Sequence, residues 1–256
     1  MLSPRQQHCL EGMGITQWKI TKAPANIATH QADQDVNHQP KAEEHKPILI
    51  PASAYAKQTE KRIAQKNYDL DDWSDIQKAI EACRNCQLAE SCTKKVAGKG
   101  NPKADLVIIG EAPGQDEDLQ GIPFVGRAGQ LLDRILLSIG LNSQDVFITN
   151  ILKCRPPNNR DPKVHEIDAC SQFLNAQIKT IQPKIILSVG RISAQSLLKT
   201  QSPLGQLRGK QYLLPETEIP LLVTYHPAYL LRNSAEKAKV WQDMKALTRQ
   251  LHTLAK

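Results

Sequence analysis

The stretch LVIIGEAPGQDEDLQGIPFVGRAG, from Leu106 to Gly129, decides the fold class of this chain. It opens with a short apolar run that predicts a buried strand, continues through a glycine-rich loop, and leads into an apolar-periodic helix. In α/β proteins, ligands bind at the loops that follow the carboxyl ends of parallel strands. Because this loop holds four carboxylates, we expect carboxylate chemistry there and not a simple phosphate-binding loop.

Strands and helices alternate through the rest of the chain. Further strands are predicted at 146–150, 184–190, 206–214 and 220–226. Helices are predicted at 76–86, where cysteines lie at the end, and at 126–140, 162–181, 191–198 and 234–251. This alternation predicts a three-layer α/β/α fold around a central, mostly parallel sheet.

The first 70 residues differ in composition from the rest. They are polar, hold four of the seven histidines and show no sustained hydrophobic period, so we expect residues 1–70 to form a disordered N-terminal extension. Residues 71–256 are expected to form one domain. No apolar run reaches the roughly 18–20 residues of a membrane span, and the N-terminus lacks the pattern of a signal peptide. We therefore expect a cytoplasmic protein that does not enter membranes.

The chain carries a formal net charge of +7 and has a pI of about 9.1. Of its 33 basic and 26 acidic residues, 9 and 7 lie in residues 1–70, so most of the positive excess belongs to the expected domain. A charge of this size fits an ordinary basic surface and also fits a polyanionic partner such as DNA.

Four of the six cysteines have the spacing of a metal site. Cys83 and Cys86 form a C-x2-C pair, and Cys154 and Cys170 lie far downstream. Four thiolates suit a zinc ion or a [4Fe–4S] cluster, and the spacing leaves both open, as it does four unrelated buried thiols. Cys92 lies close enough to Cys86 in sequence to replace one ligand. Structural disulfides are not expected without a secretion signal.

Polar residues follow three of the predicted strands. Glu111 and Glu117 follow the first, Asn150 ends the second, and His226 ends the last. Each has an ordinary interpretation, since asparagine often stabilises turns and acidic residues often cover solvated faces. The carboxyl ends of parallel strands meet at one edge of a sheet, however, so together these residues predict a site.

This combination of side chains suits the excision of a base from a nucleic acid. Amide and imidazole groups can read the edge of a flipped pyrimidine, and the ring of Phe124 can stack on it. A carboxylate can orient water or stabilise positive charge on the sugar, and an imidazole can stabilise the departing base as an anion. The segment YLLR, from Tyr229 to Arg232, can wedge into the gap left by a flipped nucleotide.

Over about residues 75–256 the chain resembles the family 4 uracil-DNA glycosylases, the iron–sulfur branch of the uracil-DNA glycosylase superfamily. The resemblance is carried by the Cys83/Cys86 pair, GEAPGQDED, GIPFVGRAG, ITNILKCRPPNNRDP, Cys170 and HPAYLLRN. It implies a monofunctional hydrolase that cleaves the N-glycosidic bond of deoxyuridine in DNA, releases uracil and leaves an abasic site. The implied partner is uracil-containing DNA, single- or double-stranded, and a monomer is expected.

The resemblance also implies roles for individual residues. The implied catalytic residues are Glu111, Glu117 and His226. The implied uracil pocket consists of Gly110, Glu111, Ala112, Phe124, Asn150, Asn159 and His226. The residues implied to contact DNA are Tyr229, Leu230, Leu231 and Arg232. The implied ligands of a [4Fe–4S] cluster are Cys83, Cys86, Cys154 and Cys170.

Further expectations concern the cluster and the type of reaction. The cluster is expected to be structural and to help present Lys153 and Arg155 to DNA phosphates. A lyase step is not expected, because no lysine is placed as an obvious Schiff-base nucleophile. The alternatives are a catalytically silent nucleic-acid-binding or accessory protein on the same fold, and an enzyme that hydrolyses free nucleosides.

Overall fold

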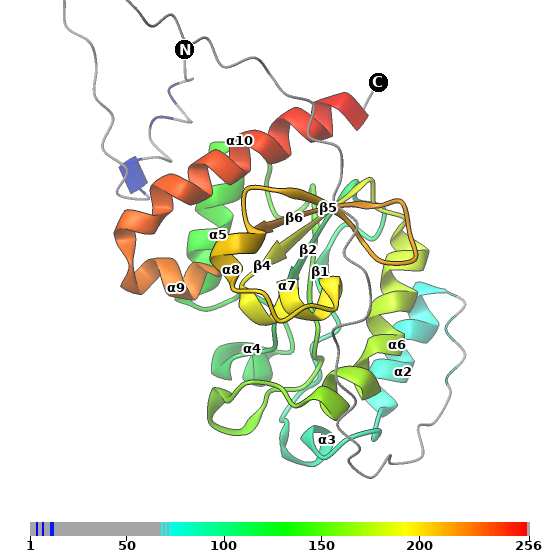
Figure 1. Ribbon diagram of the computed structural model, residues 1–256. Coiled ribbons are helices and arrows are strands. Elements are labelled where there is room, and N and C mark those ends of the chain that lie inside the picture. Colours follow the sequence, from blue (N-terminus) through cyan, green and yellow to red (C-terminus); the bar gives the residue numbers. More distant parts are fainter. Residues whose placement is uncertain are drawn as a thin grey trace, which may run out of the picture.

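A six-stranded sheet with the order β1-β3-β2-β4-β6-β5 forms the centre of the molecule in the computed structural model, which describes residues 4, 7, 11, 12, 68, 70 and 72–254 (Figure 1). The strands are β1 (Lys99–Gly100), β2 (Leu106–Gly110), β3 (Phe147–Asn150), β4 (Ile185–Val189), β5 (Gln211–Leu213) and β6 (Pro220–Thr224). The four central strands are parallel, and the edge strands β1 and β5 pair antiparallel with their neighbours. The prediction of a mostly parallel sheet is confirmed.

Helices cover both faces of this sheet. They are α2 (Trp73–Ala82), α3 (Leu88–Ser91), α4 (Gln115–Gln120), α5 (Arg127–Ser138), α6 (Val164–Ile181), α7 (Arg191–Leu198), α8 (Leu204–Leu207), α9 (Pro227–Arg232) and α10 (Lys237–Leu254). Two short 3-10 helices are η2 (Pro157–Asn159) and η3 (Ser234–Glu236). In the described part of the chain, no helix combines the length and the apolar character that a membrane span requires. The predicted extension at residues 1–70 lies almost entirely outside the described residues.

Alternation of side chains along the buried strands produces two separate cores. Leu106 and Ile108 of β2 point to one face, where they pack with α5, α9 and α10. Val107 and Ile109 point to the other face, where they pack with α6 and α7. Figure 1 shows α5, α9 and α10 on one side of the sheet and α6 on the other. The predicted three-layer architecture is therefore confirmed.

Two predicted elements differ in detail from the structure. The loop after β2 contains the short helix α4, whose first turn holds three acidic residues and which ends at Gly121 with φ of 78°. Acidic side chains stabilise a helix N-terminus, and glycine readily adopts the left-handed backbone conformation that ends many helices. The sequence of this loop therefore suits a short helix. Helix α2 ends at Ala82, which places Cys83 and Cys86 in the turn beyond it and not inside a helix.

Candidate active site

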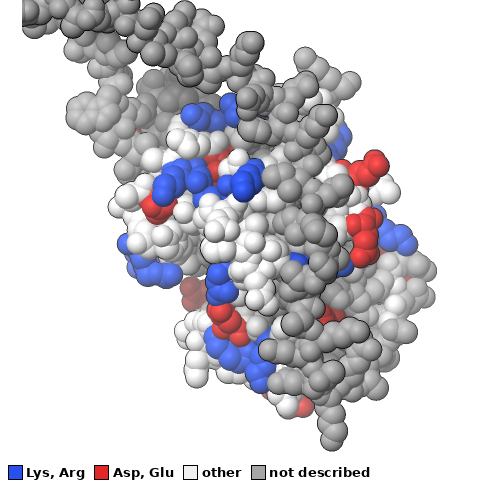
Figure 2. Space-filling model, in the orientation of Figure 1, with Lys and Arg blue, Asp and Glu red and all other residues white. Residues whose placement is uncertain are grey.

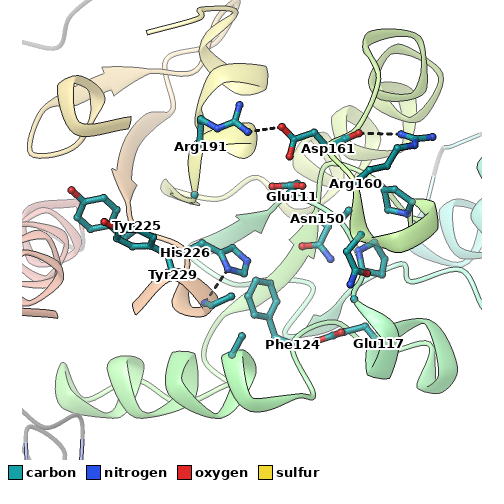
Figure 3. A pocket seen from close by; sticks show the side chains of 18 of the residues that line it. Glu111, Glu117, Phe124, Asn150, Arg160, Asp161, Arg191, Tyr225, His226 and Tyr229 are labelled. Carbon is teal, nitrogen blue, oxygen red and sulfur yellow. Dashed lines mark hydrogen bonds and ion pairs between the residues drawn. The ribbon is translucent and has the colours of Figure 1, made fainter. Parts of the chain in front are cut away.

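A pocket of about 670 Å³ opens at the carboxyl edge of the parallel strands, within the size range of small-molecule sites. Nine of the predicted residues line it: Glu111, Ala112, Glu117, Phe124, Asn150, Asn159, His226, Tyr229 and Arg232. Figure 3 shows that Glu111, Asn150 and His226, which lie at or just after separate strand ends, approach one space. The sheet therefore brings together the polar residues that the sequence places far apart.

Asn150 ends β3 at the floor of this pocket. Its side chain is buried, and its Oδ1 atom accepts no hydrogen bond from the described residues. Gly110 pairs with Asn150 across the two parallel strands, and any side chain at Gly110 would collide with Asn150 Oδ1 and with the ring of Phe124. Only glycine at position 110 leaves room for both Asn150 and Phe124 beside it. The Asn150 amide oxygen, which lacks a partner among the described residues, suits a ligand that donates a hydrogen bond.

Phe124 is held from its backbone. Its φ of 53° lies in the left-handed region, which is uncommon for a residue with a bulky side chain. Lys99 Nζ donates a hydrogen bond of 3.0 Å to the Phe124 carbonyl, and Gly129 lies so close to that carbonyl that no side chain would fit there. Strained backbone of this kind occurs at sites where the surrounding structure imposes it. Here it directs the aromatic ring into the pocket (Figure 3).

Glu111 stands at the start of the loop after β2. Burial raises the pKa of its carboxyl to about 7, with a further increase from Asp161 and an opposing effect of Arg191. Asp161 and Arg191 form an ion pair with each other, with a nitrogen–oxygen distance of 2.6 Å, and both line the pocket (Figure 3). Neither Asp161 nor Arg191 is among the site residues predicted from the sequence. The position of Arg191 directly after the β4 strand end was the available signal.

His226 caps the N-terminus of α9. Its Nδ1 atom accepts a hydrogen bond of 3.1 Å from the Ala228 N–H. Nδ1 therefore carries no proton, and the imidazole is neutral. Burial, followed by the charge of Arg232, lowers the pKa of His226 to about 4. At neutral pH the Nε2 atom therefore carries the ring's proton and can donate it in a hydrogen bond. The ring lies 5.6 Å from that of Phe124, centroid to centroid.

Helix α9 presents some of the predicted DNA-contacting residues and hides one of them. Tyr229, Leu231 and Arg232 are exposed, and the fraction of exposed surface is 42% for Leu231. Leu230 is 0% exposed and packs into the core under α9. The prediction that Leu230 contacts DNA is therefore wrong, because consecutive helical residues point in different directions.

The loop between β3 and α6 is fastened by a buried carboxylate. Glu166 accepts two hydrogen bonds from Arg160, of 2.9 and 2.6 Å, and a third from the Lys163 backbone N–H at 2.8 Å. The Arg160 guanidinium lowers the pKa of Glu166 although burial opposes this. Earlier in the loop, Arg155 Nε donates to Asn159 Oδ1 at 2.8 Å. These bonds hold the predicted residue Asn159 at the pocket wall.

In α4, the acidic residues differ in position. Glu117 lines the pocket, and its predicted catalytic role stays a prediction. Asp118 is buried and accepts a hydrogen bond of 2.9 Å from the Thr93 backbone N–H, so it supports the loop that follows α3. Only the first of the two can meet a ligand directly.

The four predicted cysteine ligands lie in one buried cluster of side chains. Cys83, Cys86, Cys154 and Cys170 are buried and belong to one cluster with side chains of α2 and α6. Backbone N–H groups of Asn85 and Lys153 lie 3.5 and 3.4 Å from the sulfurs of Cys83 and Cys170. Among the described residues, no three His, Cys, Asp or Glu side chains form a group that could hold a single metal ion. Cys92 lies beside this set, with its sulfur 3.2 Å from that of Cys154.

Lys153 does not have the predicted role. Its side chain is 1% exposed, so the ammonium cannot reach a DNA phosphate. Burial lowers the pKa of Lys153 to about 7, and the neighbouring Cys170 opposes that shift. Arg155 is partly exposed and remains available at the surface.

The surface around α9 is basic. Figure 2 shows Lys and Arg side chains over α8, α9 and α10 on the face turned to the viewer. Exposed cations in this part of the chain are Lys210, Arg232 and Lys239, and Lys239 forms an ion pair of 2.9 Å with Glu236. Exposed cations beside a pocket suit an anionic polymer whose backbone passes over it.

Comparison with known proteins assigns the family. The profile of the uracil DNA glycosylase superfamily matches residues 97–245. The chain is 41% identical to the type-4 uracil-DNA glycosylase of Archaeoglobus fulgidus over 184 residues, which cover 70% of this chain and 92% of that protein. It is 43% identical to the type-4 enzyme of Sulfurisphaera tokodaii over 185 residues, which cover 70% of this chain and 84% of the relative. The chain therefore belongs to the type-4 family of the uracil-DNA glycosylase superfamily.

Proposed function

We propose that this protein is a DNA-repair hydrolase that releases uracil from DNA by cleaving the N-glycosidic bond of deoxyuridine. The observation that carries the proposal is the convergence of Glu111, Asn150 and His226 on one pocket in a type-4 chain. A catalytically silent DNA-binding protein on the same fold would not need this set of groups. The described lining of the pocket includes no lysine, which agrees with a monofunctional glycosylase without a Schiff-base step.

Recognition of the base is assigned to the floor of the pocket. The flipped uracil would stack on Phe124, and Asn150 would meet its Watson–Crick edge. The free Oδ1 of Asn150 can accept a hydrogen bond from N3–H of uracil, a donor that cytosine lacks at this position. We place Ala112 as a small residue of the pocket lining that leaves room for the base, and Gly110 as the residue whose missing side chain lets Asn150 and Phe124 approach it. Asn159 also lines the pocket.

Cleavage is assigned to Glu111 and His226. As the bond between C1′ and N1 breaks, its electron pair leaves with the base and positive charge develops on the sugar. The ionised Glu111 stabilises that charge and orients a water molecule, which adds its oxygen to C1′ and passes its proton to the Glu111 carboxylate. His226 donates a hydrogen bond from Nε2 to the uracil anion, which its neutral ring can do without a prior protonation step. Glu117 is placed as a second acid at the entrance to the pocket.

The decisive test is uracil release from single- and double-stranded DNA by protein purified without oxygen. Release of uracil together with an intact abasic strand is the expected result. No release from iron-replete protein on either substrate would overturn the proposal. Release from free deoxyuridine alone would favour the nucleoside hydrolase alternative.

The pH dependence of the reaction should report the ionisation of Glu111. Because the carboxyl must be ionised and its pKa is raised to about 7, kcat/KM should rise between about pH 6 and about pH 8. Asp161→Asn removes a negative neighbour and should move this rise to lower pH. Arg191→Met removes a positive one and should move it to higher pH. Shifts of both profiles in the same direction would contradict the assignment of the titrating group.

Leu231 should matter more for duplex DNA than for single strands. We expect Leu231→Ala to reduce excision from duplex DNA about tenfold, because an exposed apolar side chain can fill the space of the flipped nucleotide. Single-stranded substrate needs no such wedge and should change less than about twofold. Leu254→Ala is a matched control, since Leu254 is also exposed but ends α10. An equal loss of excision rate on duplex and single-stranded DNA would show that Leu231 does not act as a wedge.

We further propose that the four cysteines bind a [4Fe–4S] cluster. Their donor chemistry fits, because four buried thiols with backbone N–H groups directed at two of them suit thiolate ligation. A cubane takes one thiolate at each iron, so its ligands surround the cluster and do not meet at one ion. When bound, the cluster would supply cross-links between the end of α2, the loop after β3 and α6.

Cys92 and Cys154 should compete for one corner of the cluster. Their sulfurs are 3.2 Å apart, so a shift of one side chain would allow either to replace the other. We expect Cys92→Ser to retain about four iron atoms per chain. Cys154→Ser should retain part of the iron through Cys92, and the double variant should lose it. Iron and sulfide analysis measures this, and complete loss in Cys154→Ser alone would show that Cys92 cannot substitute.

The state of the protein in the cell is also a proposal. We propose a monomer, because one chain provides every group assigned to the pocket. We propose that it acts in the cytoplasm on genomic DNA, with residues 71–256 as the glycosylase domain. The predicted disorder of residues 1–70 stays a prediction.

A further inference from the structure

Lys153 buries its amino group, and every hydrogen bond described for that group goes to a neutral acceptor. Its Nζ atom donates to Thr149 Oγ1 at 2.7 Å, to the Asn150 carbonyl at 2.8 Å and to Gln177 Oε1 at 2.7 Å. In the described part of the chain, none of its hydrogen-bond partners is a carboxylate. Burying an ammonium ion is costly unless negative charge lies near it. The structure therefore calls for a source of negative charge on another side of Lys153.

The four-cysteine site supplies that charge. The backbone N–H of Lys153 is 3.4 Å from Cys170 Sγ, and the next residue in the chain is Cys154. A [4Fe–4S] cluster bound by four thiolates has a net negative charge, because the thiolates outweigh the charge of the iron–sulfide core. Lys153 thus lies in the same short segment as two of the proposed ligands.

The hydrogen bonds of Lys153 and of the two residues before it also connect this segment to the uracil pocket. After β3 the chain stays paired with the loop of Glu111, since Ile151 N–H donates to the Gly110 carbonyl and Leu152 N–H to the Glu111 carbonyl, both at 3.0 Å. The Lys153 amino group donates a hydrogen bond to the carbonyl of Asn150. The side chain of Asn150 points into the pocket from the same residue (Figure 3).

We propose that Lys153 is a positioning residue that connects the four-cysteine cluster to the uracil-reading Asn150. The cluster balances the charge of the ammonium, and the ammonium fixes the backbone from which Asn150 enters the pocket. This inference rests on the proposed function and the proposed cluster. It adds that the cluster contributes to recognition of the base, and not only to the stability of the fold.

The test compares Lys153→Met with Lys184→Met, which removes an exposed lysine at the start of β4. Both variants should retain iron and sulfide. In Lys153→Met the reduction potential of the cluster should become more negative, because a nearby positive charge is lost. Its kcat should fall at least tenfold with little change in KM, whereas Lys184→Met should match the unmodified protein in both measurements.

A double variant tests the link to Asn150. If Lys153 acts through Asn150, the pair Lys153→Met with Asn150→Ala should be no slower than Asn150→Ala alone. Multiplied losses, an unchanged potential, or a kcat within about twofold of normal in iron-replete Lys153→Met would each overturn the proposal.

Lys153→Gln covers the case in which the methionine variant does not fold. The neutral amide can still donate to nearby acceptors, so it should show the lower potential with a smaller loss of kcat. Failure of both variants to fold would assign Lys153 to stability alone and would overturn the inference. If the unmodified protein releases no uracil, the proposed function fails, and the potentials still test the charge balance separately.

Discussion

Replacing Asn150 by alanine should slow uracil release by roughly 10²–10³-fold, the size expected when one preorganised hydrogen-bonding group is lost from a transition state. Asn150 is buried at the pocket floor, and its Oδ1 has no partner among the described residues. The substitution removes the group that would read the uracil edge and leaves the basic surface around α9 intact. Affinity for DNA should therefore change less than about threefold. Single-turnover excision and DNA binding in the same buffer give the two numbers.

Asn175→Ala is the control for this experiment. Asn175 is an exposed asparagine of α6, on a helix that packs against the other face of the sheet. It should leave both excision and binding unchanged. Comparable losses of excision and of DNA binding in Asn150→Ala would mean that Asn150 lies outside the base pocket.

Replacing His226 by alanine should cost a similar factor, roughly 10²-fold or more, through a different step. The imidazole is neutral, with its Nδ1 engaged by the Ala228 N–H, so it can stabilise a departing anion only by donating from Nε2. Because burial lowers its pKa to about 4, the ring stays neutral above about pH 5. The contribution of His226 should then be constant across neutral pH, in contrast to that of Glu111.

His226→Gln separates this role from the capping of α9. Glutamine is a side chain that can donate a hydrogen bond but cannot become a cation at these pH values. It should recover part of the activity lost in His226→Ala. A rate for either variant that equals that of the unmodified protein would refute the leaving-group assignment, as would a pH profile that loses its rise near pH 7 in His226→Gln alone.

The architecture could be predicted from the sequence because its signals are local. The run LVIIG is buried on both faces in β2, and similar apolar runs form β4 and β6. Parallel strands then require the loops that follow them to meet at one edge, which brought Glu111, Asn150 and His226 into one predicted site. The pattern of apolar runs and following polar residues thus predicts both the sheet and the position of the pocket.

Features that depend on tertiary contacts could not be predicted in this way. YLLR contains two adjacent leucines about 100° apart on a helix, and the sequence does not say that Leu230 faces the core and Leu231 the solvent. Lysine is ordinarily exposed, and Lys153 is buried only because acceptors from β3 and α6 surround it. The ion pair of Asp161 and Arg191 joins the loop before α6 to the first residue of α7, 30 residues farther along the chain.

The backbone of Phe124 has a consequence for the energetics of turnover. The left-handed conformation, the Lys99 hydrogen bond and the close approach of Gly129 fix the ring before any base arrives. The free-energy cost of the strained backbone and of ordering the Phe124 ring therefore arises once, when the chain folds. It does not arise again each time a nucleotide binds. A recognition surface of this kind behaves as a rigid template, and it should retain free uracil after the bond is cut, so that product inhibition becomes a direct measure of its rigidity.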